Sequence, residues 1–199
     1  MPRTLKSTIL TLSILSLLAI PSVASAHTGH THGDSSLTNG LSHPISGLDH
    51  LLAMIGVGLW ASQIGGRAKW IVPLAFVGSM VLGGVLQWAG VNVPQVEAGI
   101  AASVLILGLL IATTTKLPTW AAGAIVGLFA ICHGAAHATE FTGSSAIAYS
   151  VGFGLSTIAL HAVGMGLGVV ATQGKSTLVP RLAGGAIAVC GVLIFTDAL

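Results

Sequence analysis

Six long apolar stretches constrain the fold of this chain more than any other feature. They cover approximately residues 47–64, 70–90, 96–114, 118–138, 146–172 and 180–198, and short polar or proline-containing joints separate them. About 20 apolar residues in an α-helix cross the hydrocarbon core of a bilayer. The runs do not alternate, and lipid leaves open backbone groups unsatisfied, so helices are required. The sequence therefore predicts an all-α membrane protein, a bundle of six transmembrane helices.

The composition supports the membrane class and excludes others. Hydrophobic residues make up 53% of the 199 residues, and only 6% are charged, unlike a soluble globule. This length accommodates one compact bundle and no appended catalytic domain. The formal net charge of +2 is small and scattered, so no nucleic-acid partner is expected. Cys132 and Cys190 lie inside apolar runs and are expected to be buried free thiols.

The N-terminus has the pattern of a secretory signal peptide. Two basic residues precede the apolar run 9–20, and a small-residue cleavage motif ends at Ala26. This run is too short to cross a bilayer. The chain is thus expected to divide into a cleaved signal peptide (1–26), an extracytoplasmic His-containing segment (27–46) and a six-helix transmembrane domain (47–199).

The distribution of basic residues predicts the orientation of the bundle. Cleavage after Ala26 leaves the mature N-terminus outside, and every Lys and Arg of the mature chain then falls on the inner side, as the positive-inside rule asks. These residues are Arg67, Lys69, Lys116, Lys175 and Arg181. We expect an integral protein of the inner or plasma membrane with both termini extracytoplasmic.

Two short motifs place ionisable side chains at the outer ends of the first and fourth predicted spans. The first contains His43, Asp49 and His50, and the second contains His133, His137 and Glu140. Residues four apart share one face of a helix. Ionisable groups at membrane depth cost roughly 2.5–3.5 kcal/mol each on insertion scales and mark substrate paths. Imidazole nitrogen with carboxylate oxygen suits a borderline divalent metal, so we expect both motifs to form one outer site.

Five further features bear on that site. Pro44 and Gly47 predict an irregular peptide that lets His43 fold back towards Asp49. Asp49 itself is either a ligand or a residue that orients the His50 ring. His161 lies at mid-depth, where a helix–helix hydrogen bond and a deeper ligand are both consistent with the sequence. Glu97 fits either a residue favoured by the helix dipole or a ligand. His27, as a new N-terminus near His30 and His32, would chelate nickel, copper or zinc, or belong to a disordered polar tail.

These motifs resemble those of the HupE/UreJ family of membrane proteins, and the resemblance covers essentially the whole mature chain. The family's two signatures are matched by His43, Pro44, Gly47, Asp49, His50, Ala53 and Met54, and by His133, Gly134, His137 and Glu140. Ala138 replaces a glycine of the second signature, and Cys132 stands where an aromatic residue is common. The resemblance implies a role in nickel supply for hydrogenase or urease.

Residues and resemblance together favour a secondary permease that imports Ni²⁺, with Co²⁺ as the second candidate and Cu²⁺ or Zn²⁺ compatible with the same donors. The ion is cargo, and no prosthetic group is expected. The sequence is compatible with both a monomer and a homo-oligomer. One alternative is a metal-binding sensor or delivery protein without transport. Another is an intramembrane metalloenzyme, although Gly134 occupies the general-base position of a His-Glu-x-x-His motif, so an enzyme is not expected.

Overall fold

The computed structural model describes residues 36–141, 144–173 and 178–199, and all regular structure within these ranges is helical. The predicted signal peptide and His27 lie outside the described residues. The helices are α2 (Ser36–Ser46), α3 (Leu48–Ile64), α4 (Ala68–Trp88), α5 (Val96–Ala112), α6 (Thr119–Glu140), α7 (Ala146–Gln173) and α8 (Leu178–Phe195).

The six predicted apolar stretches coincide with α3 to α8, so the all-α prediction is confirmed. Within the described ranges, α4, α6, α7 and α8 are each long and apolar enough to cross a membrane. Helices α2 and α3 form a pair bent by 80° that would count as a fifth span, and α5 is a shorter apolar helix. The chain is a membrane protein. That it has six spans stays a prediction.

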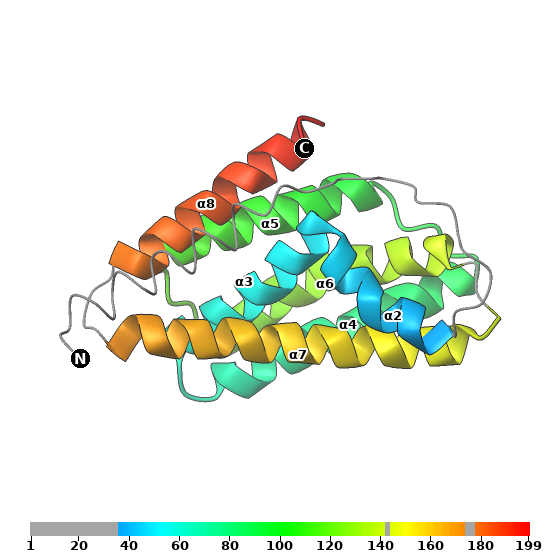
Figure 1. The fold of residues 1–199 in the computed structure, drawn as a ribbon, viewed down its shortest axis with the longest axis horizontal. Helices are drawn as coiled ribbons and strands as arrows, with labels where there is room; N and C mark the ends of the chain where they lie inside the picture. The colour runs from blue at the N-terminus through cyan, green and yellow to red at the C-terminus, as the bar shows by residue number, and fades with distance from the viewer. Residues whose placement is uncertain (1–35, 142–143, 174–177) are drawn as a thin grey trace.

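The helices pack mainly in pairs around α3. The closest pairs are α4 with α6, α5 with α8, α3 with α7 and α2 with α7, and α3 touches all six other described helices. Figure 1 shows α3 between the α5/α8 pair and the long α7. Small residues allow helix backbones to approach closely. In each pair a glycine from each helix faces the partner's backbone: Gly83 and Gly134, Gly108 and Gly184, Gly58 and Gly164, and Gly40 and Gly152.

The chain bends sharply between α2 and α3 at Gly47, the residue that precedes α3. Its backbone is extended (φ −93°, ψ 124°), and a Cβ atom here would lie 2.8 Å from the Asp49 carboxylate. The prediction of an irregular peptide at Pro44 is wrong, because α2 continues through Pro44 to Ser46. Proline has no backbone N–H to donate within a helix. Packing against α7 stabilises α2 in spite of this loss.

Hydrogen bonds join the C-terminal end of α3 to the end of α5 and the turn that follows it. The Trp60 indole N–H donates to the Thr115 carbonyl at 2.9 Å, and the Gln63 amide donates to the Ile111 carbonyl at 3.4 Å. Cys132 and Cys190 are free thiols as predicted, but they are only partly buried. In a bundle surrounded by lipid, an apolar run supplies outward faces as well as core, so apolar neighbours alone did not determine their burial.

Candidate metal centre

His43, His137 and Glu140 bring their donor atoms together from α2 and from the end of α6. Nε2 of His43 lies 3.0 Å from Oε2 of Glu140, and Nδ1 of His137 lies 3.6 Å from the same oxygen. One ligand atom from each residue falls within 4.8 Å of the other two. Among the described residues this is the group of three metal-type donors close enough to hold one ion. The two sequence motifs therefore meet.

Exposure decreases from this group towards the interior. The side chains of Glu140 and His43 are 49% and 33% exposed, whereas that of His137 is only 6% exposed. His50 is also buried, and His133 has no exposed surface. The donors thus lead from an accessible mouth into the bundle.

His137 links the mouth to two deeper imidazoles. Its ring centroid lies 4.8 Å from that of His43 and 4.5 Å from that of His50. The His50 ring in turn lies 5.0 Å from the His133 ring. Neither nitrogen of His137 has a hydrogen-bond partner in the described part of the chain. The four imidazoles form a continuous row in which His137 occupies a central place.

Asp49 determines which nitrogen of His50 is free. Oδ1 of Asp49 accepts from Nδ1 of His50 at 2.7 Å and also from the His50 backbone N–H. An ionised carboxylate only accepts hydrogen bonds, so Nδ1 carries the proton and Nε2 keeps its lone pair. Nε2 is buried and has no partner among the described groups. The geometry supports the interpretation in which Asp49 orients the His50 ring. The His43 ring lies 6.1 Å from the His50 ring, while its Nε2 pairs with Glu140.

Ser103 of α5 likewise determines which ring nitrogen of His133 is free, and the sequence did not predict this role. The Ser103 hydroxyl donates to the Ile100 carbonyl at 2.6 Å, and Nε2 of His133 lies 3.1 Å from Ser103 Oγ. Because the single hydroxyl proton is already used, Nε2 of His133 must donate. Nδ1 is then the nitrogen with a free lone pair, and it has no partner within the described ranges. One serine in an apolar helix carries no sequence signal for this role.

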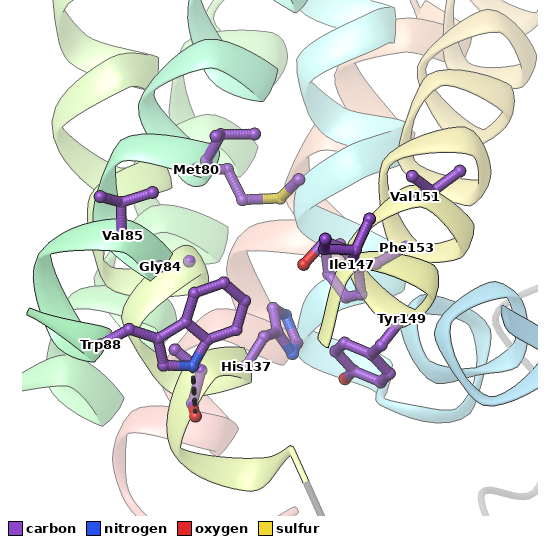
Figure 2. A pocket seen from close by; sticks show the side chains of 13 residues that line it. Met80, Gly84, Val85, Trp88, His137, Ile147, Tyr149, Val151 and Phe153 are labelled. Atoms are coloured by element: carbon purple, nitrogen blue, oxygen red, sulfur yellow. Dashed lines mark hydrogen bonds between the residues drawn. The ribbon is translucent and has the colours of Figure 1, made fainter. Parts of the chain in front are cut away.

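A cavity of about 330 Å³ opens beside His137 between α4, α6 and α7. Figure 2 shows the His137 ring pointing into it, with Trp88 on one side and Tyr149 and Phe153 on the other. The Trp88 indole N–H donates to the Ala138 carbonyl at 3.2 Å and joins α4 to α6. Phe153 lies against His137, with ring centroids 3.8 Å apart. Apolar side chains predominate in the lining, so the cavity offers His137 few further donor atoms.

The remaining sequence candidates lie elsewhere. His161 is buried on α7, and its ring contacts Phe76 rather than one of the four imidazoles of the row. Glu97 is exposed in the first turn of α5, which agrees with a residue favoured by the helix dipole. His27 lies outside the described residues, so its predicted role in metal capture stays a prediction.

Comparison with known proteins identifies the family. The profile of the HupE / UreJ protein family matches residues 15–194. The chain belongs to the HupE/UreJ family. It is similar to Protein HupE of Rhizobium leguminosarum bv. viciae, with 48% identity over 175 residues that cover 87% of this chain and 91% of the relative. No solved structure matches the chain.

Proposed function

We propose that this HupE/UreJ protein is a secondary permease that imports a divalent transition metal, Ni²⁺ first and Co²⁺ second, through its outer His/Asp/Glu site. The observation that carries the proposal is the convergence of His43, His137 and Glu140, continued inward by the buried rings of His50 and His133. Costly ionisable groups at membrane depth are kept for a substrate path. The family resemblance links the cargo to nickel enzymes such as hydrogenase or urease.

The donor chemistry accounts for both capture and passage of the ion. Imidazole nitrogen suits Ni²⁺ and related ions, while carboxylate oxygen offsets the charge of a dication that leaves water. Glu140 and His43 would take a partly hydrated ion at the mouth, and His137 would pass it to His50 and His133. The positive-inside distribution of Lys and Arg orients this mouth towards the extracytoplasmic side, with both termini on that side.

Flux measurements distinguish a transporter from a protein that only binds the metal. Purified protein in liposomes should carry radioactive nickel inward, and metal-limited cells without importers of their own should accumulate it when they make the protein. His133→Ala should reduce both signals, because it removes a buried ligand nitrogen. Cys190→Ala on α8 is the control, since its thiol is free and outside the row of imidazoles. Competition by cobalt, copper and zinc then ranks the cargo ions.

Two results would reject this proposal. Undiminished uptake in both His133→Ala and His50→Ala would show that the buried imidazoles do not lie on the path. Nickel binding by the purified protein without any flux into liposomes would instead support a sensor or delivery protein. The membrane yield of each variant, compared with that of Cys190→Ala, shows whether it is folded.

Ser103→Ala should weaken nickel binding by roughly tenfold, the lower end of the effect of groups that support metal ligands. The substitution removes the acceptor that holds His133 with its proton on Nε2, so the ring loses its fixed tautomer and orientation. Equilibrium binding of Ni²⁺ to purified protein measures the change. Thr113→Ala removes the hydroxyl of the residue that caps the C-terminal end of α5, which donates to the carbonyl of Leu109, and should leave binding unchanged. Equal affinities for the two variants would contradict the role of Ser103.

A further inference from the structure

His161 of α7 is a buried imidazole with no hydrogen-bond partner in the described part of the chain. Its residue is 1% exposed, and neither ring nitrogen has a hydrogen bond within the described ranges. Thr157 lies one turn earlier on the same helix, is 0% exposed, and its hydroxyl is likewise unpaired in the described part of the chain. Each buried polar group left unsatisfied costs roughly 1–3 kcal/mol. Two such groups in adjacent turns require an explanation.

A helix–helix hydrogen bond does not explain His161. Helix α3 packs closest to α7, but at this level it presents Gly58, whose missing side chain lets the backbone of α3 approach the His161 carbonyl. The ring instead meets Phe76 of α4 edge-on, with centroids 5.2 Å apart and planes at 88°. An aromatic ring satisfies neither an imidazole donor nor an imidazole acceptor in the way that a hydrogen bond does.

The position of Phe76 connects His161 to the outer site. The Phe76 ring also contacts His133, with centroids 5.5 Å apart. A single apolar ring therefore contacts both His161 and the innermost imidazole of the row. On α7, the Thr157 hydroxyl and the His161 nitrogens are unpaired polar groups one turn apart, and the His161 ring contacts this same phenylalanine. Both groups are as deeply buried as His133.

We propose that His161 and Thr157 form a second, inner binding position for the same divalent cation. This inference rests on the proposed function, since it concerns the ion that the outer site delivers. The imidazole supplies a nitrogen ligand, and the Thr157 hydroxyl bonds a water molecule that the ion retains. Borderline divalent ions accept this mixture of imidazole and water ligands. Binding here would satisfy the buried groups that the helices leave unpaired.

The test counts ions and measures flux in the same variant. His161→Ala in the full chain should bind one Ni²⁺ ion fewer than the unaltered protein at saturation, as measured by equilibrium dialysis of purified protein with nickel alone. Its outer-site affinity should be unchanged, while nickel flux into liposomes should fall by roughly tenfold or more, as for other losses at metal sites. His161→Gln is the matched variant, because it restores hydrogen bonding without restoring an imidazole ligand.

The outcomes distinguish the inner position from the proposed function itself. Full flux and an unchanged number of bound ions in His161→Ala would overturn the inner position and leave the permease standing. Full flux in His161→Gln would also overturn it, since the ring would then have only a polar structural role. Absence of flux in the unaltered protein would reject the permease instead. If His161→Ala does not fold, the ion count and flux of His161→Gln decide the question.

Discussion

His137→Ala is expected to reduce nickel uptake by more than roughly 100-fold, because even groups that only support a metal ligand cost 10–100-fold. His137 belongs to the group with His43 and Glu140 and also lies beside His50. Its loss therefore breaks the connection between the mouth and the buried rings. Uptake of radioactive nickel by metal-limited cells, normalised to the amount of protein in the membrane, measures the effect.

Two companion variants make this result specific. His43→Ala removes only a partly exposed donor at the mouth, so it should reduce uptake less than His137→Ala does. His137→Asn keeps a polar side chain beside Phe153 and removes the imidazole; it should be as inactive as the alanine variant. Uptake restored by His137→Asn would mean that packing, rather than a ligand nitrogen, is what the site needs at this position.

Asp49→Asn is expected to weaken nickel binding by roughly 10–100-fold, the full range seen for groups that orient metal-ligating histidines. The asparagine amide can donate to Nδ1 of His50, which shifts the ring proton to Nε2. The lone pair that the carboxylate leaves free in the present structure is then lost. Equilibrium binding of Ni²⁺ to the purified variant measures this loss directly.

A double-mutant cycle separates the two interpretations of Asp49. If Asp49 acts only through the His50 ring, then Asp49→Asn should have no further effect in a protein that already carries His50→Ala. Additive losses would instead identify the carboxylate as a ligand in its own right. Both single variants and the double variant are compared by the same nickel titration, so an effect on folding appears as a change in the bound-ion count.

The positions of the helices were largely predictable, because the length of an apolar run determines how far a helix extends in lipid. The predicted stretch 118–138 corresponds to α6, Thr119–Glu140. The spacing of His133 and His137 also predicted one shared face, and both are buried. The short helix α2 was not predicted, because Pro44 is typical of a break, whereas contacts with α7 outweigh it here.

The finer features of the site depend on contacts between distant residues. The hydrogen bond between Ser103 and His133 joins positions 30 residues apart, and the pattern of a single chain contains no trace of it. Across the 80° bend between α2 and α3, the His43 ring lies 6.1 Å from the His50 ring, and its partner Glu140 comes from the end of α6, far along the chain. The absence of hydrogen bonds to His161 among the described groups required the packing of three helices to be known.

The reciprocal glycines have a consequence for how such a protein would move. Each glycine-mediated helix pair has backbones in direct apposition, so sliding within a pair would bring larger side chains against the partner's backbone. Each pair is therefore expected to move as one block. His50 belongs to the block of α3 and α7, while His133 and His137 belong to that of α4 and α6. The seam between these two blocks passes through the imidazoles. A rocking displacement along this seam would move the donor atoms apart and lower the affinity for the ion.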